Sequence, residues 1–562
     1  MNAPKHKYPG KYPGGLSIIP LGGFYEIGKN MSLIEYEGEI LIIDCGMSFP
    51  SYDLPGVDVV IPRFDYVIEN KHRVAGIVLT HGHEDHIGAM PYLLRKAQFP
   101  VYGTRLSLSF LETKLKEHQL LMDSDLREVE DHAIYEIGNN FEVEFIPVCH
   151  SIPDACGLAI RTPDGVIVHS GDFKFDQTPV DNRKMALGTF AQYGDEGVLA
   201  LITDVTNVFN PGYTGSERRV GVALMELFKE LKGRIFVATF ASHLHRIQQV
   251  MDVAAELDRM VVPTGRRMIE YIEIARNYGY MNIPEGIIVN AENVNEYDDD
   301  DLLILATGTQ GEPGSALSLM SDGNHPVAIR RGDSVVMSAS PIPGNEAHIL
   351  RVINSLTERG ADVYFGPERG VHVSGHGSRE EIKILYNLVK PTFVFPFHGE
   401  IRHMREFETL MGKMGHDQDK VVLANIGERI RLQKNRYHVS GSVSTGVTMV
   451  DGLGVGDVDG RILGERRQLA SSGILVITVL LNAKNKKVER VELESKGVLY
   501  FDLHHELLDK SETVLRDSLR AVKEDDFIDY PNLKEKAREK MRKLFWKHLR
   551  REPYILTNVY EV

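Results

Sequence analysis

The chain has 562 residues, of which 43% are hydrophobic and 25% are charged, as is usual for globular proteins. This length predicts roughly three to four domains, and no apolar run reaches the ~18 residues that a membrane span needs. The 64 basic and 79 acidic residues give a net charge of −15, which excludes a generally basic surface. If the protein binds nucleic acid, we expect a local basic groove on an acidic body.

The cysteine content and the first residues bear on the cellular compartment. The three cysteines, Cys45, Cys149 and Cys156, are too few for a disulfide framework and fit a reducing cytosol. Residues 1–15 are polar, rich in Pro and Gly, and lack the apolar stretch of a signal peptide. We therefore expect a flexible N-terminal arm, a cytoplasmic protein and no membrane contact.

Residues 16–208 alternate short apolar runs with turns. Each run is rich in Val, Ile or Leu and ends at a Gly, His or Asp, which is typical of buried strands that present polar residues at their ends. A helix is expected at 88–97, so this region predicts sheets covered by helices. The expected strands lie in 16–23, 39–46, 74–82, 141–150, 165–172 and 197–204.

In residues 209–370, predicted helices alternate with predicted strands. This alternation predicts an α/β unit with parallel strands, and the acidic run 298–301 is interpreted as a solvated loop. The expected helices are 216–233, 242–257 and 268–280, and the expected strands are 234–240, 260–265 and 302–308.

From residue 371 to 450 the pattern returns to short strands, expected at 371–377 and 391–400. Residues 451–468 begin with a run dense in Gly and Asp, which predicts a linker or hinge. Residues 469–562 then read as a small α+β domain, with a strand at 473–481 and a basic helix at 532–552.

The strongest chemical feature is the run from His81 to His86, His-Gly-His-Glu-Asp-His, directly after a predicted buried strand. Imidazole and carboxylate groups gathered where a strand turns into a helix can converge on one point, and they are suitable ligands for zinc or a similar divalent ion. His81, His83, Asp85 and His86 are sufficient to make two adjacent metals a reasonable hypothesis. The alternative is a solvated loop rich in histidine.

Further candidate ligands end other predicted strands: His150, Asp172 and His398. A single histidine at a strand end is more often a hydrogen-bonded core residue, but together these side chains would complete a site of seven ligands and two metals. Asp44 also ends a strand. We expect it to orient a ligand histidine or the water rather than to bind metal.

The sequence HGHEDHIG, followed by a strand-end His, an SGD and a later His, resembles the metallo-β-lactamase fold family. The resemblance implies that His81, His83 and His150 hold one metal, that Asp85 and His86 hold the other, and that Asp172 bridges both. His398 fits the family's last ligand, and Asp44 fits its first motif.

The long segment between Asp172 and His398 resembles the insertion of the β-CASP branch, whose members cut nucleic acids. Asp204, His376 and His398 match three motifs of that branch. Within this branch, segments of the chain from about residue 16 to about 500 resemble the bacterial ribonuclease J family. These segments are 22–31, 41–50, 239–250, 307–313, 372–377 and 450–458.

These resemblances imply an α/β fold: a metallo-β-lactamase αββα sandwich (16–208 and 371–450) with an inserted β-CASP α/β domain (209–370) and a small α+β C-terminal domain (469–562). The chain departs from the family pattern in three places. Asp204-Val205-Thr206 replaces Asp-Ser-Thr, His243 stands where Asn is expected, and Phe24-Tyr25 interrupt the glycine-rich start.

Phosphodiester hydrolysis needs an activated water, neutralisation of oxyanion charge and a proton for the leaving oxygen. Two metals held by residues that include Asp85 and Asp172 would supply the first two. His376 is our candidate for the proton donor, with Asp204 as its orienting partner. The alternative is that His376 is purely structural or binds phosphate.

Residues 372–377 have a second predicted use, because glycine lets backbone N–H groups approach an anion. The resemblance implies a phosphate pocket that includes His372, Ser374, Gly375 and His376, with Ser242 and His245 in the same wall. A pocket for a 5′-monophosphate would set a 5′→3′ register. An ordinary tight turn is the alternative.

Three other features have two readings each. Arg246, Arg266 and Arg267 either follow the RNA backbone or are surface charges. Phe49 either stacks on a base or anchors its loop. The basic helix either binds RNA or, as its apolar spacing favours, serves packing or subunit contact; the apolar positions are Leu533, Ala537, Met541, Leu544 and Phe545.

The sequence thus favours a metal-dependent ribonuclease with 5′→3′ exonuclease and some endonuclease activity, acting in RNA maturation and decay. The expected cofactors are two divalent ions, zinc first, with Mn²⁺ or Mg²⁺ as alternatives. The expected partners are single-stranded RNA, a second copy in a homodimer or tetramer, and other RNA-decay proteins. The alternatives are a DNA-directed nuclease of the same branch, a small-molecule hydrolase of the same fold, and an RNA-binding protein without activity.

Overall fold

The computed structural model describes residues 14–50, 54–342, 345–366, 369–484, 487–500, 504–520 and 530–562. Residues 1–13 of the expected N-terminal arm lie outside this set. The described chain forms two compact units. The first runs to Ser48 and from Val60 to Thr448, and the second comprises Phe49–Val59 and Met449–Val562.

Two mixed sheets form the body of the first unit. One has eight strands in the order β22-β21-β1-β3-β4-β6-β7-β8, and the other has six in the order β19-β13-β12-β11-β10-β9. The first sheet contains β1 (Ser17–Gly22), β3 (Met31–Tyr36), β4 (Glu39–Ile43), β6 (Val74–Val78), β7 (Pro100–Gly103), β8 (Asp125–Glu128), β21 (Glu428–Gln433) and β22 (Arg436–Ser442). The second contains β9 (Ile134–Ile137), β10 (Phe141–Pro147), β11 (Cys156–Thr162), β12 (Gly165–His169), β13 (Ala200–Asp204) and β19 (Phe393–Phe397).

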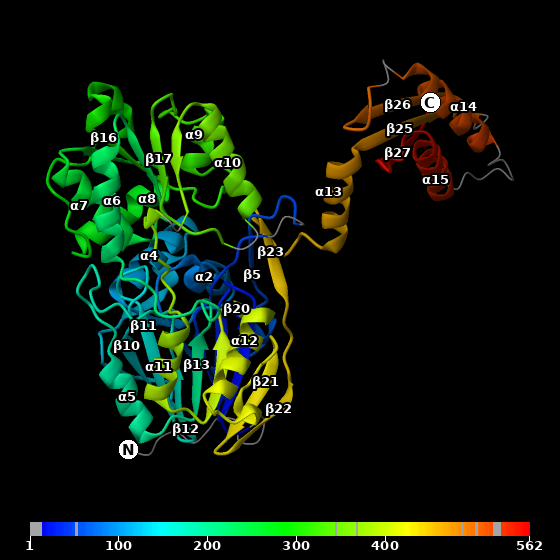
Figure 1. Ribbon diagram of the computed structural model, residues 1–562. Helices are drawn as coiled ribbons and strands as arrows, with labels where there is room; N and C mark the ends of the chain where they lie inside the picture. Colours follow the sequence, from blue (N-terminus) through cyan, green and yellow to red (C-terminus); the bar gives the residue numbers. More distant parts are fainter. Residues whose placement is uncertain are drawn as a thin grey trace. The chain divides into compact units, whose positions relative to one another are not determined.

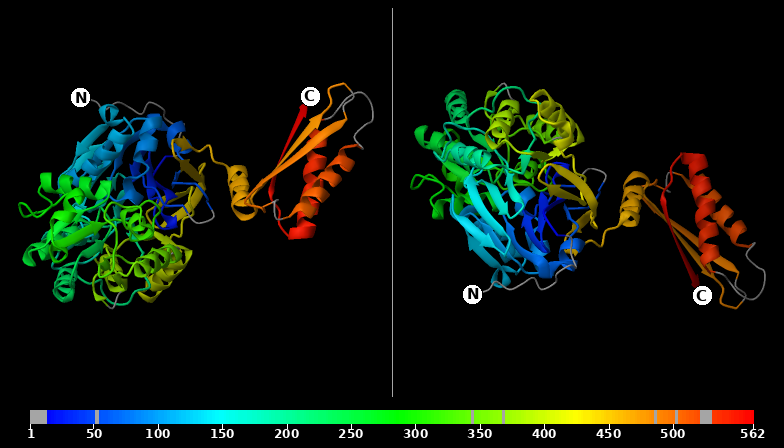
Figure 2. Two further views of the ribbon diagram at one scale, coloured as in Figure 1. Left: turned by 90° about the horizontal axis from the view of Figure 1, so that it is seen from above. Right: turned by 90° about the horizontal axis from the view of Figure 1, so that it is seen from below.

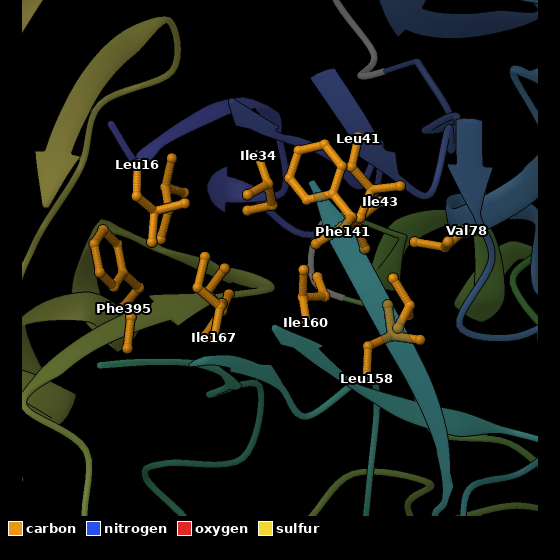
Figure 3. Packing of buried hydrophobic residues seen from close by; sticks show 14 of the residues in the cluster. Leu16, Ile34, Leu41, Ile43, Val78, Phe141, Leu158, Ile160, Ile167 and Phe395 are labelled. Carbon is orange, nitrogen blue, oxygen red and sulfur yellow. The ribbon is translucent and has the colours of Figure 1, made fainter. Parts of the chain in front are cut away.

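The core lies between these sheets, which appear as facing layers when the molecule is seen from below (Figure 2). Figure 3 shows side chains of the first sheet, such as Leu41 and Val78, opposite side chains of the second, such as Leu158 and Phe395. All four are fully buried. Burial of such side chains is the main force that holds two sheets together, and it explains the near-continuous apolar runs in the sequence.

Helices cover the outer faces of both sheets, as the metallo-β-lactamase αββα architecture requires. On the six-stranded sheet, α5 (Leu187–Glu196) lies beside α11 (Arg379–Val389), which packs on β13 (Figure 1). On the other side of the unit, α3 (Met90–Lys96) packs against α4 (Arg105–Glu117), which contacts β7 and β8. The helix expected at 88–97 is therefore present as α3.

The strands that lead into the predicted site run parallel and in register. Ala200 of β13 pairs with both Ile167 of β12 and Phe393 of β19, so these three strands end at the same edge of their sheet. In the other sheet, β6 runs parallel to β4 and leads into the short helix α2 (Glu84–Ile87). Residues that follow parallel strands meet at one edge, and the predicted ligands occupy that position.

Residues 218–364, which lie between β13 and β19 in the chain, form a separate layer around a parallel sheet of order β15-β16-β14-β17-β18. Its strands are β14 (Ile235–Ala238), β15 (Met260–Pro263), β16 (Leu302–Ala306), β17 (Ser334–Met337) and β18 (Asp362–Tyr364). Helices α9 (Ala316–Asp322) and α10 (Glu346–Glu358) share a core cluster with the sheet, and α6 (Arg218–Glu230), α7 (Leu244–Glu256) and α8 (Arg266–Asn277) complete the layer (Figure 1). The acidic run predicted as a loop ends in a single 3-10 turn, Asp299–Asp301.

One expected strand is wrong. Residues 371–377 form no strand, although they lie between β18 and α11. Their carbonyl groups bind side chains of other segments instead of a neighbouring strand, as described below. Beyond β19, the chain enters α12 (Ile401–Lys413) almost immediately.

The second unit contains the C-terminal α+β domain. The antiparallel pair of β25 (Ile474–Leu481) and β26 (Val488–Lys496) is extended by β27 (Tyr554–Glu561), which is parallel to β25. Helices α14 (His505–Arg520) and α15 (Tyr530–Leu549) lie against one face of this sheet (Figures 1 and 2). The segment predicted as a linker, 451–468, holds the end of β23 (Val447–Asp451), β24 (Gly454–Val455) and much of α13 (Gly460–Ser472).

The apolar stripe of the basic helix has an intramolecular explanation. Leu533, Ala537, Met541 and Phe545 of α15 are at most 2% exposed and belong to the core of the C-terminal domain, so they are not available for subunit contact. Among the described residues, no helix is both long enough and apolar enough to cross a membrane.

Candidate metal centre

Three histidines bring their ring nitrogens together at the edge of the first sheet. His83 Nδ1 lies 3.0 Å from His81 Nε2 and 3.1 Å from His150 Nε2. His81 and His83 come from the turn between β6 and α2, and His150 follows β10. His150 turns its other nitrogen, Nδ1, to the carbonyl oxygen of Gly375 at 2.8 Å, which leaves Nε2 for the cluster. Three imidazole nitrogens facing one another are arranged as ligands of one ion.

A second group lies beside the first. His398 Nε2 is 2.9 Å from Asp85 Oδ2, and His86 Nε2 is 3.7 Å from the same oxygen. Asp172 Oδ2 lies 3.3 Å from His86 Nε2. The ligand atoms of Asp85, His86, Asp172 and His398 therefore form a compact set, drawn from α2 and from the ends of β12 and β19.

Asp172 stands between the two groups. Its Oδ2 is also 3.9 Å from His81 Nε2 and 3.8 Å from His150 Nε2. Its other oxygen, Oδ1, is buried and has no hydrogen-bond partner in the described part of the chain. A buried, unpaired carboxylate oxygen is costly, and a bound cation on that side would remove the cost.

The electrostatics of the cluster also suit bound cations. Burial, reinforced by the neighbouring histidines, lowers the pKa of His83 to about 4 and holds the pKa of His81 and of His150 well below the usual value. Burial would raise the pKa of Asp172, but His398 and His86 outweigh it and hold that pKa well below its usual range. Neutral imidazoles and ionised carboxylates are the forms that bind metal, so the three-histidine group and Asp172 are in those forms. Burial would lower the pKa of His86 and of His398, but the carboxylates of Asp172 and Asp85 outweigh it and raise both pKa values, so these two side chains would bind metal with release of a proton.

Asp44 orients the cluster from beneath. Its Oδ2 accepts hydrogen bonds from His86 Nδ1 at 2.7 Å and from Thr80 Oγ1 at 2.8 Å, and Thr80 Oγ1 is 3.1 Å from His81 Nδ1. Metal-ligating histidines commonly donate their second N–H to such a carboxylate. Asp44 and His398 both have a φ of 57°, a strained conformation for residues with a Cβ that is typical of functional sites.

His376 lies next to the cluster and is held by Asp204. His376 Nδ1 is 2.7 Å from Asp204 Oδ2 and 4.0 Å from Asp172 Oδ2. Burial would lower the pKa of His376, but Asp204 outweighs it and raises that pKa to about 9. Thr206 joins this pair to the metal cluster, because its Oγ1 donates to Asp204 Oδ1 and lies 2.7 Å from His398 Nδ1.

Residues 371–377, here called the phosphate segment, turn their carbonyl groups toward the protein. Val371 O accepts from Arg246, Ser374 O from Lys174, Gly375 O from His150, and His376 O from Asn207 and Thr214. In the described chain, the backbone N–H groups of residues 372–375 have no such partner. A Cβ on Gly375 would lie 2.8 Å from His150 Cε1, so only glycine permits this close approach to the metal cluster.

Other predicted substrate contacts are placed differently. Arg246 is fully buried and paired with Glu217 Oε1 at 2.6 Å, so the prediction that it follows the RNA backbone is wrong. Arg266 and Arg267 both pair with Glu117. His245 is buried against Asp181 at 3.1 Å, and no described hydrogen bond joins it or Ser242 to the phosphate segment. Phe49 is 59% exposed and belongs to the second unit.

Several residues of the site escaped the sequence analysis. Asn30 Nδ2 lies 3.0 Å from His86 Nε2, and the sequence indicates its segment, 22–31, only through a family resemblance. Asn207, Thr214 and Lys174 have no sequence pattern that marks them. Their role exists only because the chain between β12 and α6 folds back onto the phosphate segment.

Four family models match the chain. They are the metallo-beta-lactamase superfamily (residues 25–225), the beta-CASP domain of ribonuclease J (232–356), the Zn-dependent metallo-hydrolase RNA specificity domain (366–423) and the ribonuclease J C-terminal domain (461–562). The first three follow the two-part body and its inserted parallel sheet, and the fourth covers the C-terminal α+β domain.

Relatives match over most of their length. Ribonuclease J of Thermus thermophilus is 44% identical over 83% of this chain and 82% of that protein. Ribonuclease J2 of Bacillus subtilis is 36% identical over 97% of this chain and 98% of that protein. A solved structure of a protein of unknown function from Enterococcus faecalis V583 has a TM-score of 0.50 and 15% identity, covering 74% of this chain and all of that one; it bears on the fold alone.

Proposed function

The chain belongs to the ribonuclease J family and is a metal-dependent ribonuclease, and from this premise we propose that it degrades RNA stepwise from a 5′-monophosphate end. Some cleavage at internal sites accompanies this 5′→3′ activity. The observation that carries the proposal is the 2.8 Å contact between His150 of the metal cluster and Gly375 of the phosphate segment. This contact supports a pocket for a terminal phosphate next to the site of cleavage.

We assign the metal ligands as two sets joined by one carboxylate. His81, His83 and His150 would hold one ion, Asp85, His86 and His398 would hold the other, and Asp172 lies within reach of both groups. The donor set, the ionised buried carboxylates and the unpaired Asp172 Oδ1 all fit divalent ions, with Zn²⁺ favoured over Mn²⁺ or Mg²⁺ by the imidazole ligands. Two such ions would supply an activated water and neutralise the charge on the phosphate oxygens.

His376 supplies the proton that the leaving 3′-oxygen needs. Its Nδ1 is fixed by Asp204, so Nε2 is the nitrogen that faces the substrate. The adjacent carboxylate keeps the imidazole charged near neutral pH, as a general acid must be. Thr206 donates to Asp204, and Asn207 donates to the carbonyl oxygen of His376. These two contacts fix the position of the proton donor.

The phosphate segment reads the 5′ end. The carbonyl groups of Val371, Ser374, Gly375 and His376 are bound by the protein, and in the described structure the backbone N–H groups of residues 372–375 are left available to an anion. The side chains of Ser374 and His372 lie beside the same partners, since Ser374 Oγ accepts from Asn207 Nδ2 at 2.9 Å and His372 Nδ1 is 3.5 Å from Arg246 Nη1. Successive free N–H groups form an anion-binding nest. Because the segment touches His150, a terminal phosphate held there sets the distance to the scissile bond.

The first test is cleavage of one single-stranded RNA with a 5′-monophosphate, a 5′-triphosphate or a 5′-hydroxyl end, and of a DNA of the same sequence. We expect mononucleotides released from the 5′ end, fastest for the monophosphate, with loss of activity on chelation and recovery with Zn²⁺ or Mn²⁺. Equal rates for all three ends would overturn the end-reading pocket. Cleavage of DNA at the same rate would favour a nuclease without preference for RNA, and no cleavage of either would favour a small-molecule hydrolase or a binding protein.

We further propose that the enzyme acts in cytoplasmic RNA maturation and decay as a homodimer or tetramer, together with other RNA-decay proteins. Light scattering of the purified chain decides the oligomeric state. Depletion followed by sequencing of RNA 5′ ends tests the cellular role, with accumulation of monophosphorylated 5′ fragments as the expected result.

A further inference from the structure

Two buried cations hold the phosphate segment at different points. Arg246, on α7 of the inserted domain, donates from Nη1 to Val371 O at 3.0 Å. Lys174, which follows β12 in the other part of the unit, donates from Nζ to Ser374 O at 3.2 Å. Both side chains are at most 2% exposed. A segment without strand partners is therefore fixed by charged groups that arrive from two different domains.

Each cation also binds the structure behind the segment. Arg246 Nη1 donates to the carbonyl oxygen of Ser338, at the end of β17, at 2.9 Å, and Ser338 Oγ donates in turn to Val371 O at 2.6 Å. Lys174 Nζ donates to Gly215 O at 3.3 Å. The contacts tie the segment to the edge of the inserted sheet on one side and to the residues before α6 on the other.

The two charges belong to one compensated network. Arg246 pairs with both oxygens of Glu217, at 2.6 and 3.1 Å. The backbone N–H of Glu217 donates to Asp176 Oδ2 at 2.9 Å, and that oxygen is 4.0 Å from Lys174 Nζ. Buried charges are costly unless they are paired, and apolar side chains often fill such a space as well or better. Stability alone therefore does not account for a charged network at this place.

We propose that Arg246 and Lys174 are positioning residues that set the selectivity for the 5′ end, by holding the carbonyl groups of the phosphate segment so that its N–H groups face the terminal phosphate. This inference rests on the proposed end-reading pocket. It replaces the predicted contact of Arg246 with the RNA backbone by an action through Val371.

His376 is anchored independently of these cations. Asn207 and Thr214 bind its carbonyl oxygen, and Asp204 binds its Nδ1. Loss of Arg246 is therefore expected to loosen residues 371–374 more than the proton donor. The expected kinetic signature is a KM for 5′-monophosphate RNA that rises about tenfold, the usual scale for one charge-assisted hydrogen bond, with a smaller fall in kcat.

The test compares Arg246→Met with a matched control, Arg234→Met. Arg234 is also a buried arginine of the inserted domain, paired with Asp333 Oδ2 at 2.6 Å and bound to a backbone carbonyl, that of Ala328. Arg234 precedes β14, whereas Ser338, which Arg246 binds, follows the parallel strand β17. The two arginines therefore bind at opposite ends of the strands of one sheet. Both variants lose a buried ion pair, but only one loses a contact with the phosphate segment.

A double variant, Arg246→Met with Glu217→Met, separates positioning from stability. Removing both charges is expected to recover much of the lost stability, because no buried charge is left unpaired. It does not restore the hydrogen bond to Val371. We expect the preference for 5′-monophosphate over 5′-hydroxyl RNA to stay about tenfold below that of the wild type in the double variant, and to be near the wild-type value in Arg234→Met.

Hydrogen exchange of the phosphate segment gives a readout that needs no activity. The backbone N–H of His376 donates to Ser374 Oγ at 3.1 Å, so its exchange rate reports on the position of Ser374. This amide is expected to exchange faster in Arg246→Met and in Lys174→Met than in Arg234→Met. Unchanged exchange in both variants would overturn the positioning role. If exchange rises but end preference stays at the wild-type value, the selectivity claim is wrong. If the wild type itself does not distinguish 5′ ends, both the proposed pocket and the selectivity claim are wrong. The exchange measurement still shows, in that case, whether the two cations hold the segment.

Discussion

The metal cluster and the phosphate segment touch each other but are built in different ways. His81, His83, Asp85 and His86 come from one strand-to-helix turn, and Asp172 and His398 follow two strands of one sheet. Each ligand is positioned chiefly by the strand before it. The phosphate segment has no strand, and its carbonyl groups depend on Lys174, Asn207, Thr214 and Arg246. We therefore expect the geometry of the metal cluster to tolerate substitutions of neighbouring residues. We expect the phosphate segment to lose its function stepwise as each of its side-chain contacts is removed.

The largest effect is expected at the carboxylate shared by both metal groups. Asp172→Ala should lower kcat/KM by ~10³-fold or more, because both ions lose a ligand, while the unfolding midpoint changes little. Mass spectrometry of the native protein should find less bound metal. Asp195→Ala, which removes an exposed carboxylate on α5, is the control. Full activity with normal metal content in Asp172→Ala would contradict the assignment of Asp172 as the bridge.

The next largest effect is expected at His376, the proposed proton donor, which belongs to the phosphate segment and lies next to the metal cluster. His376→Ala should slow single-turnover cleavage by ~10²-fold, the usual scale for general acid catalysis, with a much smaller change in RNA affinity. Because Asp204 acts through His376, the double variant His376→Ala with Asp204→Asn should be little slower than His376→Ala alone. Additive losses in that cycle would show that Asp204 acts independently.

A moderate effect is expected at Lys174, which donates a hydrogen bond to Ser374 O of the phosphate segment. Lys174→Met should reduce the preference for 5′-monophosphate RNA about fivefold to tenfold, because Ser374 O loses its charged donor. Metal content measured on the same sample should stay normal, since Lys174 binds none of the ligand atoms of the cluster in the described structure. A parallel loss of metal would mean that the two regions are not separable at this point.

The smallest effect is expected in the pH dependence of folding at His243, behind the phosphate segment. Burial lowers the pKa of His243 to about 4, below the ~6.5 of an unfolded histidine. The unfolded chain therefore binds more protons between these values, so stability is lost as the pH falls below ~6.5. His243→Asn removes this titration and should spare about 2 kcal/mol of the loss between pH 6.5 and 5, at ~1.4 kcal/mol per pH unit. Urea unfolding at both pH values measures the difference, and an identical pH slope in both proteins would contradict it.

Much of the metal cluster followed from the sequence, because short-range order was enough. A buried strand that ends in His-Gly-His-Glu-Asp-His, and other strands that end in His or Asp, place ligands at sheet edges wherever the strands are parallel neighbours. The alternation of helices and strands likewise gave the inserted layer, with α6, α7 and α8 close to the predicted ranges.

The sequence could not decide which charged or apolar residues are buried and bound by other residues of the same chain. Arg246 is of a residue type that is usually exposed, yet it is buried because Glu217 and two backbone carbonyl oxygens, those of Ser338 and Val371, bind its guanidinium from distant parts of the chain. Residues 371–377 have the apolar and glycine content of a strand, but no strand in the described part of the chain forms a ladder with them. The apolar stripe of α15 suited a partner subunit equally well until β25 and β27 were seen to cover it.

The sequence by itself determined the candidate ligand residues, the strand ends that carry them and the alternation of helices and strands in the inserted layer, since these depend on local pattern and periodicity. Only the tertiary structure decided which groups Asp172 joins, how the phosphate segment is held and that His376 is anchored apart from Arg246. These features depend on contacts between residues far apart in the chain, and their free energy comes from burial and charge pairing that no local window of sequence contains.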